Sequence, residues 1–578
     1  MILSRRALSV MGGLLAALLL APAAASAHAL LVDTVPQRGA TLTTPPREVV
    51  LHFSEAVEGN FGAVRVFDAA ARRVDDGRSF HPGGSGARLA VGLKPGLPHG
   101  TYVATYRVIS ADSHPISGGL VFSVGAPGAA AAPTVAELIG DSAAGPVTQV
   151  AFGVARGLTY LATALLLGGL AFLLAVWRPA LRAAAGAAEA WREAAAAFAL
   201  RLRRILLLAA GLGIVAGFAG IVLQGATAGA TSAWSALSPD VVGDVLGTRF
   251  GHVWGLRVVA FLALGGALAL ALPGPRRLPL ALAALPAAFL AMAPALGGHA
   301  SVQSPVALLF PLDAAHVMAM SVWIGGLFAL LFVLPAATRR LEANDRTRLL
   351  AAALLRFSPM ALACVGVLLL TGTLQAIEHV GSWSALRDTG FGRAVLIKIG
   401  LIVALIAIGA VNRRRVVPGL TRLAEASAAP GELGHLLRRT LRAEVALVVV
   451  VLGVTSALVS YPPPDSLASG PFSANTALGP LRLEVTMDPA RVGPNELHLY
   501  LLRARDGAPF TATKQLDATL ALPAKHIGPL ALKAREAGPG HYVVDTVALV
   551  PGGDWRLRVT SRVSEFDQYE TTLQVPVR

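Results

Sequence analysis

The sequence predicts a membrane protein in three parts. These are an N-terminal all-β sandwich of the immunoglobulin-like or Greek-key kind, a central all-α domain of eight membrane-spanning helices, and a C-terminal all-β sandwich. Hydrophobic residues make up 54% of the 578 residues and charged residues only 14%, with a mean hydropathy of +0.62. Soluble domains carry about 25% charged residues. The long apolar runs lie between residues 147 and 460, and short alternating runs flank them on both sides.

Residues 1–27 have the pattern of a cleaved secretory signal. Arg5 and Arg6 precede an apolar stretch, and the small residues Ala25-Ser26-Ala27 end it. Cleavage there makes His28 the first residue of the mature chain, with a free α-amine and an imidazole on one residue. That pair of nitrogen donors can chelate a metal ion.

Residues 28–125 alternate between apolar and polar positions in short runs such as VVLHF, AVRVF and YVATYRV, with Pro, Gly and Asp turns between them. This pattern predicts a small β sandwich. The stretches HALLVDTVPQRGATLTTPP, LHFSEAVE and GTYVATYRVISADSHPISGGLVFSVG resemble the CopC family of periplasmic copper-binding proteins. The resemblance implies that Cu(II) is bound by His28 together with Asp112 and His114 of an Asp-x-His loop.

The chemistry of these three residues supports the same assignment. Imidazole, amine and carboxylate donors in a tetragonal arrangement suit Cu(II). An Asp-Ser-His in a loop is more often a set of exposed polar residues that bind nothing. His28 at the cleavage site nevertheless favours metal binding. The segment contains no methionine, so a thioether-rich Cu(I) site is not available here.

Residues 126–146, which include APGAAAAP, are predicted to be a linker. A membrane domain is predicted over residues 147–460, because apolar runs long enough to span a bilayer recur there. The eight predicted spans are 147–176, 205–223, 252–272, 278–296, 312–335, 357–377, 393–412 and 441–460. An even number of spans puts both β domains on one side of the membrane.

The distribution of arginine predicts which side that is. The odd-numbered loops are rich in arginine, whereas the even-numbered loops hold only Arg249 and Arg387. The positive-inside rule therefore puts the odd loops in the cytoplasm and both β domains on the periplasmic or extracellular side of the inner membrane. The formal charge of +15 reflects this topology, and no nucleic acid partner is expected.

Within the membrane domain, DAAHVMAMSVWIGGL, RFSPMALACVGVLLLTG and VLIKIGLIVALIAIGAVNR resemble the CopD family of copper-resistance and copper-uptake membrane proteins. The two resemblances together indicate a CopC-CopD fusion. This implies movement of copper across the inner membrane, inward, with copper ions, the lipid bilayer and periplasmic copper chaperones as partners.

One predicted span carries polar side chains on a single helical face, where Asp313, His316, Met320 and Trp323 recur at intervals of three or four residues. A polar group in hydrocarbon is costly without a partner, so this face should point at other spans. We expect a copper entry site centred on His316, with His299 and Met320 or Met318 as co-ligands and Asp313 fixing the tautomer of the imidazole. The alternative is that these are interfacial histidines wetted by water or headgroups.

Residues 466–578 alternate again, as in LRLEVTM, ELHLYLLRA and WRLRVT, and predict a second exported sandwich. The stretch DPARVGPNELHLYLLRARDGAPF is similar to YtkA-like or FixH-like domains. His498 is expected in a strand, and His526 and His541 in turn-like segments. All three are interpreted as surface or structural histidines.

The sequence contains no G-x-S-x-G, Walker, Rossmann or protein-kinase motif, so neither a hydrolase nor an ATP-driven pump is indicated, and no enzymatic activity is expected. Two function classes remain alongside a simple anchored copper scavenger. The first is a copper transporter. The alternative is a membrane redox protein with b-type haem that reduces Cu(II) or passes electrons to quinone, in which Arg156, Arg257 and Lys398 pair with the propionates.

Overall fold

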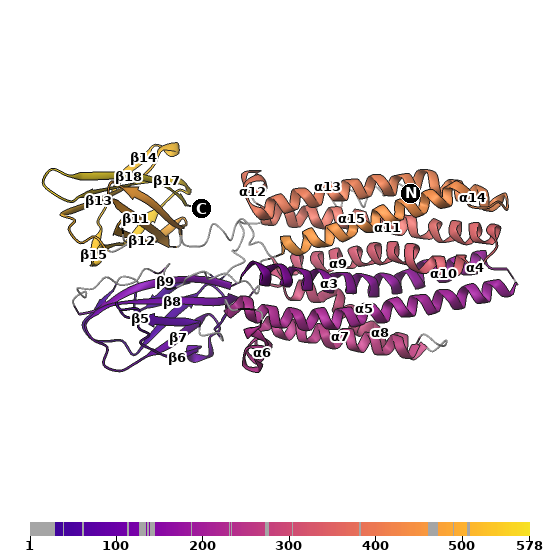
Figure 1. Cartoon of the computed structure of the whole chain (residues 1–578), viewed down its shortest axis with the longest axis horizontal. Coiled ribbons are helices and arrows are strands. Elements are labelled where there is room, and N and C mark those ends of the chain that lie inside the picture. Colours follow the sequence, from indigo (N-terminus) through magenta and orange to yellow (C-terminus); the bar gives the residue numbers. More distant parts are fainter. Residues whose placement is uncertain are drawn as a thin grey trace.

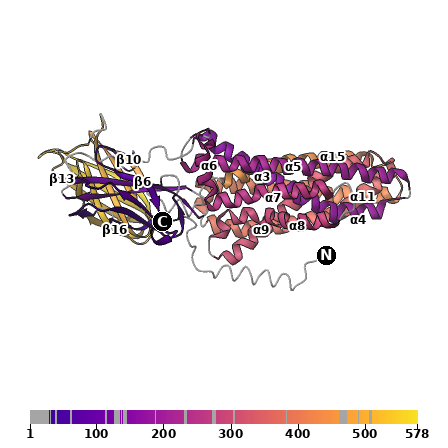
Figure 2. The same ribbon diagram turned by 90° about the horizontal axis from the view of Figure 1, so that it is seen from below.

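The computed structural model describes residues 29, 31–37, 40–59, 63–111, 115–125, 135, 138, 145–186, 188–229, 232, 234–271, 277–302, 305–380, 383–459, 472–488, 490–505 and 509–577. These residues form two β domains and a long helical bundle, and both β domains lie at the same end of the bundle (Figure 1). Seen from below, the strands again lie at one end of the molecule and the helices at the other (Figure 2). The predicted fold class is confirmed.

The N-terminal β domain is a sandwich of two mainly antiparallel sheets. One sheet has the order β1 (Leu31–Val35), β3 (Glu48–Phe53), β7 (Arg88–Leu93) and β6 (Asp75–Phe80). The other has the order β2 (Thr41–Leu42), β9 (Pro115–Val124), β8 (Gly100–Ser110) and β4 (Val57–Glu58), and β5 (Val64–Phe67) also pairs with β8. Alternate residues of both sheets fill the core, among them Leu51, Phe53, Leu89 and Phe122.

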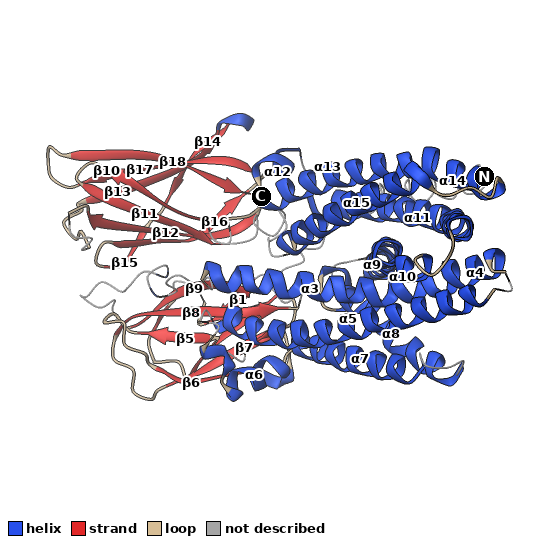
Figure 3. Cartoon of the chain, turned by 45° about the vertical axis from the view of Figure 1, so that its right-hand side comes forward, coloured by secondary structure: helices blue, strands red, loops and turns tan. Residues whose placement is uncertain are grey.

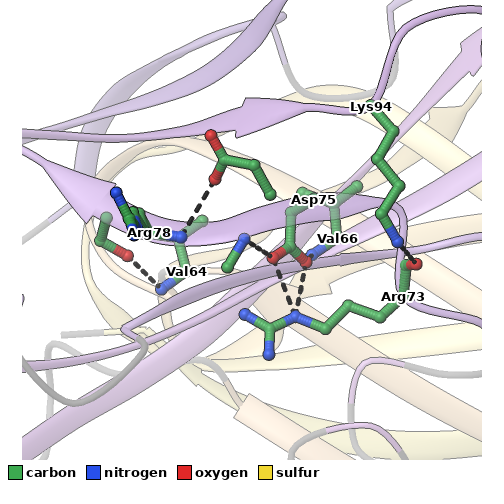
Figure 4. Close-up of polar contacts among 9 residues, drawn as sticks. Val64, Val66, Arg73, Asp75, Arg78 and Lys94 are labelled. Carbon is green, nitrogen blue, oxygen red and sulfur yellow. Dashed lines mark hydrogen bonds and ion pairs between the residues drawn. The ribbon is translucent and has the colours of Figure 1, made fainter.

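A buried carboxylate fixes the connection between β5 and β6. Asp75 is 3% exposed, and its Oδ2 accepts a hydrogen bond of 2.8 Å from the backbone N–H of Val66. Its two oxygens also accept from Nε of Arg73 at 2.8 and 2.9 Å, and Oδ1 accepts from the N–H of Gly77 (Figure 4). These partners offset the cost of burying the charge and hold β6 beside β5.

The bundle contains a helix for every predicted span. The helices are α3 (Pro146–Ala171), α5 (Glu189–Gly229), α7 (Arg249–Ala271), α8 (Arg277–Leu296), α9 (Val306–Phe328), α11 (Ala343–Val380), α13 (Gly390–Val411) and α15 (Gly431–Leu458). Seven of the described helical segments are long and apolar enough to cross a membrane, and the described apolar part of α8, Ala283–Leu296, is shorter. α8 runs beside α7 (Figure 1). Short helices α6 (Pro239–Leu246) and α12 (Trp383–Asp388) lie at the β-domain end.

Several helices continue past the predicted spans at the end far from the β domains. Helices α5, α11 and α15 begin well before residues 205, 357 and 441. The additional turns are rich in Ala, Leu and Arg, which favour helix whether or not they are apolar. The apolar run therefore predicts the part of the helix that spans the membrane, but it does not predict where the helix begins or ends.

At this far end, three helices widen into a π-helical turn and then continue as α4 (Arg178–Ala184), α10 (Leu334–Thr338) and α14 (Val417–Glu425). A proline follows each π turn two residues later. Its ring would clash with the carbonyl group four residues earlier, which lies inside the π turn, and the wider turn relieves that clash. The three turns are Phe172–Trp177, Ala329–Val333 and Asn412–Val416, and the prolines are Pro179, Pro335 and Pro418.

Helices α3 and α9 approach each other at two glycines. A Cβ atom added to Gly168 would lie 2.1 Å from the carbonyl oxygen of Ser321, and one added to Gly325 would lie 2.3 Å from that of Ala164. The two backbones are therefore in direct contact, as is common where small residues face each other between membrane helices. We refer to this contact as the α3–α9 crossing.

The C-terminal β domain is a second sandwich. One sheet has the order β10 (Phe472–Leu478), β11 (Leu481–Asp488), β12 (Gly493–Arg503), β16 (His541–Leu549) and β15 (Arg535–Gly538). The other has the order β14 (Ile527–Leu532), β13 (Gln515–Leu522), β17 (Gly553–Arg562) and β18 (Gln568–Val577). His526 lies in an exposed turn as expected, but His541 is the first residue of a strand and is 2% exposed, so its predicted turn position is wrong.

Candidate functional site

The three residues of the predicted Cu(II) set, His28, Asp112 and His114, lie outside the described residues, and the set stays a prediction. The strands beside them are described. Leu31 at the start of β1 pairs with Phe53, and Val57 of β4 pairs with Ser110 at the end of β8. Since Phe53 and Val57 are four residues apart, the register brings the start of β1 and the end of β8 to the same region of the domain.

This region of the N-terminal domain is attached to the bundle by Arg249, the first residue of α7. Its backbone N–H donates to Oε1 of Glu58 at 2.6 Å, and its Nη1 donates to the carbonyl oxygen of Ala111 at 3.4 Å. Its Nη2 donates to Oγ of Ser301 at 2.7 Å and to the carbonyl oxygen of Leu296 at 3.2 Å. One arginine thus joins the residue before Asp112 to the connection between α8 and α9.

Glu58 is the acidic side of this junction. Burial raises the pKa of its carboxyl group, and the N–H of Arg249, the side chain of Thr248 and the charge of His252 partly offset the increase. His252 itself lies exposed near the start of α7. A second attachment comes from Arg107 of β8, whose Nε and Nη2 donate to the last carbonyl groups of α5, at Ala228 and Thr227.

Polar side chains from five helices lie in the half of the bundle nearer the β domains. At 1.5 Å per residue, their positions are about 8 to 21 Å along each helix from its β-domain end. We call this set the polar belt. Its members are Arg156, Thr159 and Tyr160 of α3, Arg257 of α7, Asp313 and His316 of α9, Thr371 and Gln375 of α11, and Lys398 of α13. The face predicted from the α9 sequence therefore does point at other helices.

The hydrogen bonds around His316 define its tautomer. Nδ1 of His316 lies 2.7 Å from Oγ1 of Thr371, and that hydroxyl donates its single hydrogen to the carbonyl oxygen of Val367 at 2.8 Å. With its hydrogen on Val367, the hydroxyl accepts from Nδ1–H, and the lone pair is then on Nε2. A Cβ atom on Gly372 would lie 3.5 Å from Cε1 of this ring, in ordinary contact.

Asp313 is the one carboxylate of the polar belt. Its Oδ1 accepts a hydrogen bond of 3.3 Å from Nε2 of Gln375. Lys398, reaching in from α13, interacts electrostatically with Asp313 and with His316, and Tyr160 also interacts with Asp313. The ammonium group of Lys398 is therefore one cation whose charge stabilises the carboxylate.

Two arginines form the other side of the polar belt. Arg257 is 3% exposed, donates from Nη2 to Oγ1 of Thr159 at 3.0 Å, and has its guanidinium group 4.7 Å from the ring centre of Trp254. Arg156 lies 4.3 Å from the ring centre of Phe152. Contacts with aromatic faces stabilise such cations where water is excluded. With Lys398, the polar belt holds three basic residues against one acidic residue.

The predicted co-ligands of His316 are placed differently from one another. Met320, one turn along α9, is partly buried in the bundle, whereas Met318 is 41% exposed and lies on another side of the helix. His299 lies in a 3-10 turn, His299–Ser301, and its side chain is not described. Within the described part of the chain, no three His, Cys, Asp or Glu side chains converge as a metal site. The geometry favours Met320 over Met318 as a partner.

The structure also has two buried polar contacts that the sequence did not predict. Glu444 of α15 is 4% exposed, and its Oε1 accepts from Nδ2 of Asn412 at 3.3 Å. His498 and His541 meet in the C-terminal domain, where Nδ1 of His498 lies 3.1 Å from Nε2 of His541. The alternation in ELHLY was a usable signal, because it puts Glu496, His498 and Tyr500 on one strand face.

Comparison with known proteins agrees with this architecture. The CopC domain model matches residues 31–125, the model of the N-terminal domain of copper resistance protein D-like proteins matches residues 147–308, and that of copper resistance protein D matches residues 351–458. The chain belongs to the copper-resistance family and carries a CopC domain and a CopD membrane domain in one multi-pass polypeptide.

One relative is similar along nearly the whole chain, and others are similar to the N-terminal domain. Copper transport protein CutJ of Bacillus subtilis (strain 168) is 28% identical over 571 residues, which are 96% of this chain and 97% of that protein. Copper resistance protein C of Pseudomonas syringae pv. tomato is 30% identical over 116 residues, 19% of this chain and 91% of that protein. The crystal structure of CopC from Methylosinus trichosporium OB3b is 28% identical and covers 17% of this chain and 93% of that chain, with a TM-score of 0.15.

Proposed function

We propose that this protein captures Cu(II) with its N-terminal β domain outside the inner membrane and moves copper inward through the bundle. Three findings support the proposal. The chain belongs to the copper-resistance family and resembles a copper transport protein along its length. Arg249 links the residue before Asp112 to the bundle. The polar belt then offers an imidazole among the helices.

The observation that carries the proposal is the 2.7 Å contact between Nδ1 of His316 and Oγ1 of Thr371. With Nδ1–H donated to that hydroxyl, Nε2 keeps the lone pair that a metal ion requires. Imidazole nitrogen binds both oxidation states of copper, and the thioether of Met320 favours Cu(I). His316 is the eleventh residue of α9, about 15 Å along the helix from its start beside the β domain.

Lys398 supplies positive charge near the site before copper enters it. Its ammonium group interacts electrostatically with Asp313. A copper ion bound to His316 would bring its own positive charge next to that carboxylate and would repel Lys398. Entry of copper therefore exchanges one cation for another, and Asp313 does not have to be left buried and unbalanced.

The test is copper accumulation in cells that make His316→Ala at the same membrane abundance as the intact chain. We expect uptake to fall to the level of cells without the protein. His435→Ala is the matched control, because His435 is an exposed histidine at the start of α15. Its Nδ1 lies 3.2 Å from Nη2 of Arg438. Equal uptake by His316→Ala and the intact chain would show that the entry site is wrong.

A second function, reduction of Cu(II) by a b-type haem, is favoured by one observation. Arg156, Arg257 and Lys398 put three positive charges at one level of the bundle, where two propionates could pair with them. His316 would then be an axial ligand. A Soret band in the purified intact chain that disappears in His316→Ala would replace the transport function with this one.

A further inference from the structure

Strand β12 separates two kinds of side chain. One face carries leucines that pack in the core of the C-terminal sandwich, namely Leu497, Leu499 and Leu501. The other face carries Glu496, His498 and Tyr500, and the register of β16 puts His541 directly opposite Tyr500. This second face is not the core face. Nevertheless, His498 is only 3% exposed and His541 only 2% exposed.

The N-terminal β domain lies against this face of the sheet. Strands β12 and β15 are on the side of the C-terminal domain that faces β8 and β9 (Figure 1, Figure 3). Oγ1 of Thr101 in β8 donates to the carbonyl oxygen of Ala537 at 3.1 Å. The next residue, Gly538, pairs with His541 across β15 and β16. The histidine pair therefore lies at the boundary between the two β domains.

The spacing of the two imidazoles suits a shared metal ion. Two nitrogen ligands at about 2.0 Å from one metal lie about 2.8 Å apart at a right angle and about 3.3 Å apart at a tetrahedral angle. Nδ1 of His498 and Nε2 of His541 are 3.1 Å apart, between these two values. For a metal ion to bind both nitrogens, the hydrogen of the donating nitrogen moves to the other nitrogen of the same ring, and the rings tilt so that both lone pairs point at the ion.

Neighbouring side chains contact both rings. Oε1 of Glu496 lies 3.4 Å from Nε2 of His498, the nitrogen turned away from His541, which is close but not a hydrogen bond. A carboxylate that closes this distance would orient the imidazole for metal binding. The ring of Tyr500 stacks on that of His541 at 4.2 Å between centres and 9° between planes.

The ring of His541 is buried and neutral. Its Nδ1 is buried and has no hydrogen-bond partner among the residues that the structure describes. Burial, together with the neighbouring charges of His498 and Arg535, holds the pKa of His541 well below its ordinary value of 6.5, so the ring is neutral at neutral pH. A neutral imidazole is the form that binds a metal.

We propose that His498 and His541 bind a copper ion between the two outer β domains, at a site separate from His28, Asp112 and His114. The choice of copper rests on the proposed function. The binding geometry does not, because it suits any late first-row metal with imidazole affinity. The described part of the chain supplies two protein ligands to this ion, which leaves it open to exchange with a further ligand.

The test uses the purified full chain with His114→Ala and His316→Ala, so that the two sites of the proposed function are removed and the histidine pair is intact. We expect this double variant to keep one Cu(II) equivalent whose electron paramagnetic resonance spectrum shows coupling to nitrogen. Adding His541→Gln should remove that equivalent. Adding His526→Asn should not, because His526 is an exposed histidine of the same domain whose left-handed backbone (φ 57°) asparagine tolerates.

Two results would overturn the proposal. One is a double variant that holds no copper. The other is a folded His541→Gln derivative that holds as much copper as its parent. If His541→Gln does not fold, His498→Gln takes its place, since it keeps the stacking of His541 on Tyr500. None of these readouts measures uptake, so a failure of transport and a failure of this site are distinguished.

Discussion

At the scale of single residues, the hydroxyl of Thr371 favours one tautomer of His316. While its hydrogen is donated to the carbonyl oxygen of Val367 one turn earlier on α11, the hydroxyl can only accept from the imidazole. A change at position 371 therefore alters the chemistry of a histidine on another helix. Thr371 is a positioning residue and does not need to touch copper.

The first prediction follows from this hydrogen bond. Thr371→Val should weaken copper binding at His316 by about 10- to 100-fold, the usual effect of losing the partner that orients a metal-binding histidine. Thr371→Ser should retain nearly full binding, because serine keeps the acceptor. Binding is measured by copper competition with a chelator in a His114→Ala/His541→Gln background. A Thr371→Ser variant as weak as Thr371→Val would contradict this role.

The second prediction concerns His541 and pH. Because the folded protein holds the pKa of His541 below 6.5, its neutral form contributes stability that is present above pH 6.5. That stability is lost as the pH falls below 6.5, where the unfolded chain takes up a proton and the folded one does not. The loss approaches about 1.4 kcal/mol for each pH unit.

Thermal unfolding of the copper-free β domains, followed by circular dichroism between pH 7.5 and 5.5, measures this loss. His541→Gln should flatten the dependence of Tm on pH, and His526→Asn should leave it as it is in the intact chain. The same slope in His541→Gln as in the intact chain would assign the acid sensitivity to another group.

At the scale of helices and strands, the α3–α9 crossing brings the backbones of two long helices into direct contact. The third prediction is that Gly168→Ala destabilises the bundle by about 1 to 3 kcal/mol, since its Cβ would lie 2.1 Å from a carbonyl oxygen that cannot rotate away. Gly211→Ala is the control, because a Cβ atom at that position on α5 would have nothing within 4 Å beyond its chain neighbours and the adjacent backbone of its own helix. It should be neutral or stabilising. Tm of the purified protein in detergent compares the two.

The element scale also shows where sequence reasoning succeeds. Apolar length located the eight long helices, and the period of 3.6 residues correctly grouped Asp313 with His316. The partners of those residues, Gln375 and Thr371, come from α11 and are 62 and 55 residues away. Their identity depends on how two helices pack, which a single sequence does not contain.

The histidine pair was missed for a similar reason. Alternation put His498 on the polar face of a strand, but only the register of β12 against β16 brings His541 next to it. The turn residues Gly538 to Gly540 suggested that His541 was still in a turn. In addition, that face would be solvent-exposed in an isolated sandwich, and it is buried here because a second domain stands against it.

At the scale of the whole molecule, the two β domains face each other beside the end of the bundle. The fourth prediction is that Thr101→Cys with Gly538→Cys forms a disulfide in the exported protein. The new Cβ atom at Gly538 would lie 4.0 Å from Oγ1 of Thr101, the atom whose place the sulfur of a cysteine at position 101 can take, so the two sulfur atoms can come together. Two free thiols at these positions would show that the domains do not meet.

The chain is well suited to that experiment. Its one native cysteine, Cys364, is buried within the bundle. Thiol titration of the unfolded protein should therefore find one free thiol in the double variant and two in each single variant. Reduction should raise the number in the double variant to three.

The burial of the helices also divides the bundle into a fixed part and a movable part. Buried residues make up 67% of the most apolar stretch around α9, but only 17% of that around α13. Helix α9 is locked to α3 by the glycine contact, whereas α13 is held by little besides α15. Lys398 is on α13, and Asp313 and His316 are on α9. An outward movement of α13 would therefore separate the ammonium group from the carboxylate and expose His316, whereas α9 would stay in place against α3.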